Sequence, residues 1–155
     1  MAVLRIALLQ LVSCGRDRAA NRHKGEDFCR RASAMEADVA LFPEMWSIGY
    51  HAFDPDVSGD RQAWLSLAVA RDDAFVQHFR QLARSLRMAI GITYLERWSG
   101  SPRNTFTLFD GHGDEVLTYA KMHLCPWDPP DNVCTPGDEF PPPPVRARRA
   151  PGRAR

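Results

Sequence analysis

Apolar residues near the amino terminus fall into two short runs that are typical of strands in a buried sheet. Residues 3–11 are almost continuously apolar, which suits a strand buried on both faces. Residues 37–42 form the second run, and Pro43 ends it because proline lacks the backbone donor that a central strand needs. Between them, residues 18–36 contain no proline and follow Asp17, which can cap a helix. The order of strand, helix and strand predicts the start of an α/β sheet.

The clearest helical pattern begins at Asp72 and Asp73, whose charges favour a helix start through the helix dipole. The following apolar residues recur at steps of three and four and would share one face: Phe75, Val76, Phe79, Leu82, Ala83 and Leu86. Before this helix, residues 47–63 mix Gly, Pro, Asp and aromatic residues, which predicts a long irregular segment just after Glu44. Segments of that length inside a compact domain are often functional.

Three more strands are predicted in the apolar and β-branched stretches 88–95, 105–109 and 115–119. Residues 110–114 join the last two as a hairpin turn, in which we expect the glycines to take positive φ angles. No internal repeat is visible. The whole pattern predicts a single α/β domain.

Composition changes sharply after Lys121, since nine of the twelve prolines lie between residues 126 and 151. Four of them are consecutive, from 141 to 144, and such a run favours an extended polyproline conformation over a helix or a central strand. We therefore predict a packed domain over residues 1–140 and a disordered Pro/Arg-rich tail over residues 141–155.

Length, composition and charge exclude several classes of protein. With 155 residues, 45% of them hydrophobic and 25% charged, the chain suits one globular domain with a buried core. Its longest uncharged apolar stretch, residues 6–12, is far short of the roughly 20 residues of a membrane span, and no signal peptide is recognisable. We expect a cytoplasmic protein that does not bind membranes.

Positive charge is concentrated at the carboxyl end. The net charge is +1, and the last ten residues hold five arginines and no acid, so the first 145 residues carry a net charge of −4. The body of the chain therefore has no general attraction for nucleic acid. The arginines themselves leave open an alternative, binding to phosphate backbones or an anionic membrane, although basic tails of this size are usually just solvated.

The four cysteines show neither the paired spacing nor the His-Cys clustering of a zinc site. A disulfide framework is not expected in a cytoplasmic protein. We therefore predict no metal, and we place Cys29 in the core as a small buried hydrophobe.

Two charged residues at predicted strand ends are candidates for chemistry. Glu44 follows a strand at its carboxyl end, where open α/β sheets place ligand-binding residues, and it could take a proton from a thiol or a water. Lys121 lies among Tyr119, Ala120 and Met122, and a fixed cation there would stabilise a developing oxyanion. Each residue taken singly has the alternative of a solvated side chain, and His123 is more simply structural.

Glu44 and Lys121 are part of a larger sequence pattern, which resembles the amino-terminal part of the nitrilase superfamily of carbon–nitrogen hydrolases. The matching pieces occur in the family's order: Gln10, residues 37–46, Gly49-Tyr50, Gly91-Ile92, Glu96-Arg97, Asn104-Thr105, Asp110-Gly111, residues 121–124 and Thr135-Pro136-Gly137-Asp138. The Pro-Glu and Lys-x-His-Leu boxes are the specific parts, and the likeness extends over about residues 3–140.

This resemblance implies an α-β-β-α sandwich, here incomplete at the carboxyl end, whose subunits pair into homo-oligomers. It implies that Glu44 is the general base and Lys121 the oxyanion-stabilising lysine of a Glu-Lys-Cys triad that needs no cofactor. Such enzymes hydrolyse a small-molecule amide, nitrile or carbamoyl substrate. We expect Trp46 and Tyr50 to line the substrate site.

Two departures from the family pattern stand out. Many members carry a second glutamate soon after the lysine, and here the nearest acids are Asp128 and Asp131, of which Asp131 better fits the spacing and is our candidate for substrate binding. The cysteine box on a strand-to-helix turn has no counterpart. Cys125 is too close to Lys121 and Cys134 lies in a proline-bounded loop, so neither is expected to be the nucleophile.

The composition after Phe140 suggests a GC-rich gene translated out of frame. We therefore expect a hydrolase truncated before its cysteine and inactive alone, with one sheet face and several strand edges unpaired. The alternative is a non-catalytic binding module that docks on a full-length homologue.

Overall fold

The computed structural model describes residues 3–127 and 129–139. Their elements follow one another as β1 (Ile6–Leu8), α1 (Arg18–Ala34), β2 (Val39–Leu41), α2 (Asp60–Leu65), α3 (Ala74–Leu86), β3 (Ala89–Glu96), β4 (Arg103–Phe109), β5 (Glu115–Ala120) and a 3-10 turn, η1 (Asp131–Val133). The predicted α/β class is confirmed. The described residues form one sheet and one layer of helices, and the predicted tail, residues 141–155, lies outside them.

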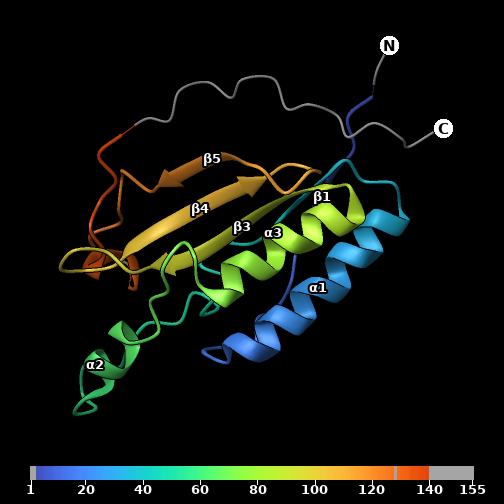
Figure 1. Cartoon of the computed structure of the whole chain (residues 1–155). Coiled ribbons are helices and arrows are strands. Elements are labelled where there is room, and N and C mark those ends of the chain that lie inside the picture. Colours follow the sequence, from blue (N-terminus) through green and yellow to red (C-terminus); the bar gives the residue numbers. More distant parts are fainter. Residues whose placement is uncertain (1–2, 128, 140–155) are drawn as a thin grey trace.

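The strands form a five-stranded sheet in the order β1-β2-β3-β4-β5 (Figure 1). β1, β2 and β3 run parallel, whereas β4 and β5 continue the sheet as antiparallel neighbours. The carboxyl ends of β1, β2, β3 and β5 therefore meet at one edge of the sheet. This topology brings the residues after β2 and after β5 to the same edge, although they are far apart in the sequence.

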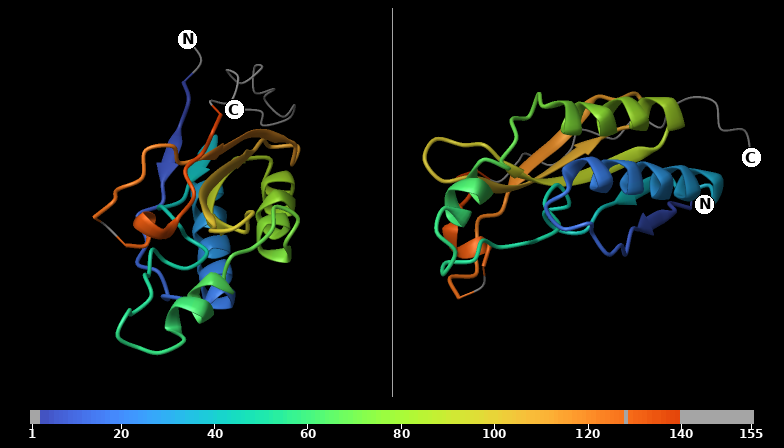
Figure 2. Two further views of the ribbon diagram at one scale, coloured as in Figure 1. Left: turned by 90° about the vertical axis from the view of Figure 1, so that its left-hand side faces the viewer. Right: turned by 90° about the horizontal axis from the view of Figure 1, so that it is seen from below.

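Helices α1 and α3 lie side by side against one face of the sheet (Figures 1 and 2). Asp17 caps α1 by accepting a hydrogen bond from the Ala20 N–H, and Asp73 caps α3 through the Phe75 N–H. The main core lies between these helices and the sheet, and it holds Cys29 as predicted. Its buried residues include Phe42, Phe75, Val76, Phe79, Leu82, Ile90, Ile92 and Tyr94. No helix among the described residues is long and apolar enough to cross a membrane.

Helices α1 and α3 leave the opposite face of the sheet uncovered. Alternate strand residues point to this face, and on β1 they are largely exposed, with Ile6 at 51% and Leu8 at 69% of their full surface. Across the central strands the backbone is covered by neighbouring side chains, because a Cβ added at Gly91 would lie 2.6 Å from Phe106 and 2.7 Å from Leu41. We call this side of the sheet the open face.

Three expectations need correction. β1 is shorter than predicted and is not buried on both faces, because no layer of the described chain packs on its outer side. Residues 60–65 of the supposedly irregular segment form the short helix α2, since Asp60 supplies a negative charge to its first turn. In the hairpin turn only Gly113 has a positive φ, and Gly111 instead packs closely on the backbone of Arg87.

Candidate active site

The backbone around Glu44 is fixed from both sides by one side chain of β3. The Thr93 hydroxyl accepts a hydrogen bond from the Trp46 N–H at 2.9 Å and donates one to the carbonyl of Pro43. Met45 is fully buried and has a φ of +49°, a left-handed conformation that few residues other than glycine adopt. The turn after β2 is therefore locked in place, and it holds Glu44 over the end of the sheet.

Lys121 continues the ladder between β5 and β4. Its N–H donates to the Asn104 carbonyl at 2.8 Å, and its carbonyl accepts from the Gly137 N–H at 2.9 Å. Only glycine fits at position 137, because a Cβ there would lie 2.2 Å from the Ala120 carbonyl oxygen. The lysine backbone is thus held between two neighbouring segments, and its side chain starts from a rigid point.

Four side chains from these segments close into a ring of hydrogen bonds. Lys121 Nζ lies 2.8 Å from Oε1 of Glu44 and 2.6 Å from Oδ2 of Asp131. Nδ2 of Asn104 donates to the same Glu44 oxygen at 2.6 Å and to Oδ1 of Asp131 at 3.1 Å. We call these four residues the Glu44 ring. It joins two residues, Glu44 and Lys121, that are separated by 77 positions in the chain.

Charge and burial set the protonation states in the ring. Burial lowers the pKa of Lys121, but hydrogen bonds from its ammonium to Asp131 and Glu44 outweigh this and raise the pKa above the ordinary lysine range. Burial alone would raise the pKa of Asp131, whereas its contacts with Lys121, the Cys125 N–H and Asn104 lower it overall. At neutral pH the ring therefore holds one ammonium between carboxylates.

A second, smaller hydrophobic core lies next to the Glu44 ring. It contains Met45 beside Glu44, Leu95 on the strand next to Asn104, and Trp64 of α2, all fully buried. Val133 and Cys134 pack on it directly after Asp131, so this core contacts every segment that contributes to the ring except β5. The precision of the site thus depends on apolar packing as well as on polar contacts.

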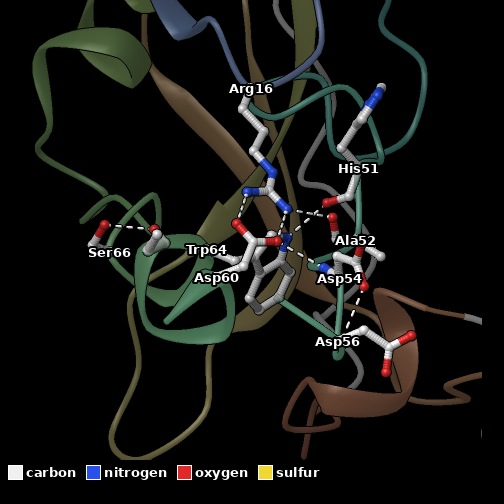
Figure 3. Close-up of polar contacts among 9 residues, drawn as sticks. Arg16, His51, Ala52, Asp54, Asp56, Asp60, Trp64 and Ser66 are labelled. Carbon is white, nitrogen blue, oxygen red and sulfur yellow. Dashed lines mark hydrogen bonds and ion pairs between the residues drawn. The ribbon is translucent and has the colours of Figure 1, made fainter. Parts of the chain in front are cut away.

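The long segment after Glu44 is clamped to the loop that precedes α1. Figure 3 shows the guanidinium of Arg16 facing the carboxylate of Asp60, with nitrogen to oxygen distances of 2.6 and 2.8 Å. Arg16 also donates to the carbonyl of Ala52 at 2.6 Å, and Asp60 accepts from the Asp54 N–H at 2.7 Å. Trp64 adds a hydrogen bond to the His51 carbonyl at 2.7 Å. Residues 51–54 are therefore tied to α2.

The predicted site residues occupy different environments. Glu44, Lys121 and Asp131 come together in the ring, with Asp131 fully buried and the Glu44 side chain 44% exposed. Trp46 lies in the main core and donates its indole N–H to the Asn21 carbonyl, so it offers almost no surface to a ligand. Tyr50 is half-buried against the smaller core. Substrate contacts by Trp46, Tyr50 and Asp131 stay predictions.

Asn104 is the ring member whose chemical role sequence reasoning missed. It was part of the family pattern, but an uncharged amide inside a strand gives no sign of function. Its partners are 60 and 27 residues away, so only the sheet topology brings them to it.

Two cysteines, Cys125 and Cys134, lie near the ring, and the thiol of Cys134 is not activated. Burial, together with the charges of Asp131 and Glu44, raises the pKa of the Cys134 thiol to about 12 even though Lys121 opposes this. A thiol with that pKa is protonated at neutral pH. Cys125 contacts Asp131 through its backbone N–H. Among the described residues no group of His, Cys, Asp and Glu is arranged to hold a metal ion.

Comparisons with known proteins give one family. A sequence profile described as carbon–nitrogen hydrolase matches residues 5–149. The chain is similar in structure to an amidase from Nesterenkonia sp., with a TM-score of 0.70 and 26% identity over 90% of this chain and 50% of that one. No curated protein matches.

Two further solved structures share the fold at lower identity. A carbon–nitrogen hydrolase from Helicobacter pylori G27 has a TM-score of 0.73 and 20% identity over 87% of this chain and 45% of that one. A CN-hydrolase superfamily protein from Xanthomonas campestris has a TM-score of 0.74 and 22% identity over 90% and 48% of the two chains. This chain spans about half the length of these structures.

Proposed function

The chain belongs to the carbon–nitrogen hydrolase family, and on that premise we propose that Glu44 and Lys121 are two members of a Glu-Lys-Cys triad. The observation that carries this proposal is the 2.8 Å contact between Lys121 Nζ and Glu44 Oε1. The proposed substrate is a small-molecule amide, nitrile or carbamoyl compound, and the proposed location is the cytoplasm. No cofactor, nucleic acid or membrane takes part.

Within the Glu44 ring, one N–H donor of Lys121 and one oxygen of Glu44 are not used, and they suit the roles of oxyanion stabiliser and general base. Lys121 uses two of its three N–H donors on Glu44 and Asp131, and Glu44 uses one of its two oxygens. Among the described residues, neither the third donor nor Oε2 of Glu44 has a hydrogen-bond partner. The free donor can stabilise the oxyanion of a tetrahedral intermediate, and the free oxygen can accept a proton from a thiol or a water.

In the proposed reaction Glu44 takes the proton of a cysteine thiol, and the thiolate attacks the carbonyl carbon of an amide. Lys121 stabilises the oxyanion that forms, and the protonated Glu44 gives its proton to the leaving amine. Glu44 then activates a water that hydrolyses the thioester, which restores the thiol. A nitrile would first form a thioimidate when the thiolate adds to its carbon and the nitrogen takes up a proton. Addition of a water to the thioimidate then gives the tetrahedral intermediate that loses ammonia and leaves the same thioester.

We propose that none of the four cysteines in these 155 residues is the nucleophile. Cys29 is buried in the main core, where burial raises the pKa of its thiol to about 12. Cys134 is protonated for a similar reason, and its thiol contacts the carbonyl of Pro130 at 3.5 Å. If none of the four is the nucleophile, these residues alone should not hydrolyse amides.

The test joins residues 1–139 to the carboxyl-terminal half of the Nesterenkonia amidase, a protein solved in complex with butyramide. Release of ammonia from butyramide is measured for this chimera and for the 155-residue chain. The chimera should be active and the chain inactive. Glu44→Gln and Lys121→Met should each lower kcat of the chimera by about 100-fold or more, the usual effect of losing such a group.

Matched controls are available in the same chain. Glu36→Gln removes an exposed carboxylate that pairs with Arg5, and Lys24→Met removes the other lysine of the sequence. Neither should change kcat. A folded, active chimera that keeps its rate after Lys121→Met would refute the assigned role of the lysine, and amidase activity of the 155-residue chain would refute the assignment of the cysteines.

The open face favours a second candidate, a non-catalytic module that docks on a full-length homologue. Ile6 and Leu8 are exposed there, and a hollow of about 600 Å³ at the ends of β1 and β2 is lined by residues 8–12 and 41–43, most of them apolar. Exposed apolar areas of this kind often mark protein interfaces. A pull-down of a full-length family member by the 155-residue chain should succeed if docking is the function, and absence of binding at micromolar concentration would exclude it.

A further inference from the structure

We infer that Asn104 is a positioning residue, which holds the carboxylates of Glu44 and Asp131 on either side of Lys121. The inference rests on the proposed function of Glu44 and Lys121 and adds a residue to which no role had been given. It concerns the orientation of the base, because Asn104 acts on the reaction only through Glu44.

The geometry requires the amide nitrogen, and not the amide oxygen, to face both carboxylates. Both partners are acceptors when ionised, and only an NH₂ group offers two hydrogens from one atom. Nδ2 of Asn104 uses one on Oε1 of Glu44 at 2.6 Å and the other on Oδ1 of Asp131 at 3.1 Å. The amide thus contacts both carboxylates and adds no charge of its own.

Such a bridge is needed because the ring has two negative charges and one positive charge. Two carboxylates that share a site repel each other, and the repulsion is stronger where water is excluded. Asp131 is fully buried and cannot move away, whereas the side chain of Glu44 is 44% exposed. Without the bridge, Glu44 would turn toward solvent and leave Lys121 to Asp131 alone.

The position of Asn104 in the fold makes it suited to this task. It lies on β4 between two strands, pairs with Leu95 on β3, and accepts the N–H of Lys121 at its carbonyl. The residue is 6% exposed, so its side chain is confined. Asn104 therefore sets the direction of Glu44 Oε1 from a strand that is paired on both sides.

Substitutions of Asn104 should act on Lys121 in a way that depends on charge. Asn104→Ala removes both hydrogen bonds, so Glu44 is released and Lys121 loses one of its two anionic partners. Asn104→Asp is nearly the same size but adds a third carboxylate next to the lysine. The first change should lower the pKa of Lys121 by about one unit, and the second should not lower it. A purely structural loss would lower it in both.

The 155-residue chain offers a direct measurement, because Lys121 and Lys24 are its only lysines. With lysine labelled at Cε, two signals are followed by NMR from pH 8 to pH 12. In the parent chain Lys121 should keep its proton to higher pH than Lys24, and in Asn104→Ala it should begin to lose the proton at lower pH, while Lys24 stays unchanged in every variant. An unchanged Lys121 in Asn104→Ala, or an equal fall in both variants, would overturn the inference.

A second measurement needs no change at Asn104 and covers the case in which its variants do not fold. The two side-chain amide protons of Asn104 have separate NMR signals. Glu44→Gln should shift mainly one of them and Asp131→Asn mainly the other, whereas Glu36→Gln should shift neither. If both protons respond to only one carboxylate, Asn104 does not bridge the pair.

The catalytic consequence is tested separately in the chimera. Asn104→Ala should lower kcat about tenfold or more with little change in KM, because the base is misdirected while the substrate site is intact. A chimera without any activity would count against the proposed function and leave the NMR result standing. An active chimera in which Asn104→Ala keeps the parent kcat would overturn the positioning role.

Discussion

The two faces of the sheet differ in how far they bury apolar side chains of the same type. On the helix-covered face, Ile90, Ile92 and Tyr94 of β3 are fully buried against α1 and α3. On the open face, Ile6 and Leu8 of β1 remain exposed, and the Glu44 ring lies at the edge where the strands end. The stability of the described residues thus comes mainly from the helix-covered face, whereas their proposed chemistry lies at the edge where the strands end.

The difference between the faces does not come from amino-acid type. Isoleucine occurs on both, at 0% exposure in Ile92 and 51% in Ile6. What differs is the presence of a second layer, because a strand residue is buried only when something packs on its side. Matched substitutions can therefore separate the contribution of the covering layer from that of the residue.

The largest expected effect is on the helix-covered face. Ile92→Ala should lower the free energy of unfolding by about 2 to 5 kcal/mol, because it leaves a cavity in a packed core. The matched Ile6→Ala should cost less than about 1 kcal/mol, since the side chain is already half exposed. Urea unfolding monitored by circular dichroism measures both. Similar losses for the two variants would show that the open face is covered in solution.

A smaller effect is expected at the edge where the ring lies. Asp131→Asn keeps the shape of a fully buried side chain but removes its charge beside Lys121, and a hydrogen bond to a charged group is worth about 1.5 to 3 kcal/mol. Urea unfolding at pH 7 should show a loss of this size. The exposed Asp56→Asn is the control and should change stability little.

The same pair of variants predicts a dependence on pH. Folding lowers the pKa of Asp131, so its stabilising effect is complete above the ordinary aspartate range and disappears as the pH falls below about 4. The stability difference between the parent and Asp131→Asn should therefore be largest near neutral pH and shrink in acid. A difference that grew toward low pH would contradict a carboxylate stabilised by Lys121.

Helices and strands that depend on interactions between near neighbours in the chain could be predicted from the sequence. Helix α3 was predicted because Asp72 and Asp73 favour a helix start and its apolar residues recur on one face, and both features depend only on near neighbours. The structure adds that Asp73 caps the helix. Burial of β1 on both faces was predicted wrongly, because burial depends on another layer and an apolar run cannot show whether that layer is present. Short α2 was missed for lack of a helical pattern within its six residues.

In the candidate site, too, features that depend on distant contacts could not be predicted from the local sequence. Glu44 and Lys121 were found as a pair only through the resemblance to a family, since nothing in their local sequences links residues 77 positions apart. Asn104 was quoted for the same resemblance without a role, because the contact of one amide with two carboxylates is a property of the folded sheet. Trp46 was expected near substrate from its place beside Glu44; the structure places it in the main core, and its contact with substrate stays a prediction.

The last and smallest effect on stability is expected for Leu8→Lys, which changes association instead. Leu8 is 69% exposed on the open face, so a lysine there should alter the free energy of unfolding by less than about 0.5 kcal/mol. A charge in the middle of an apolar area opposes contact with another apolar surface, because it would have to be desolvated. Sedimentation velocity should therefore show more monomer for Leu8→Lys than for the parent chain.

The control for this experiment is Val57→Lys, a change at another exposed apolar residue, which lies in the segment before α2 and is 53% exposed. It adds the same charge to the molecule, so any general effect of net charge on solubility appears in both variants. Association reduced only by Leu8→Lys would locate the contact on the open face. Equal reduction by both would assign it to charge alone, and the open face would then not be the contact surface.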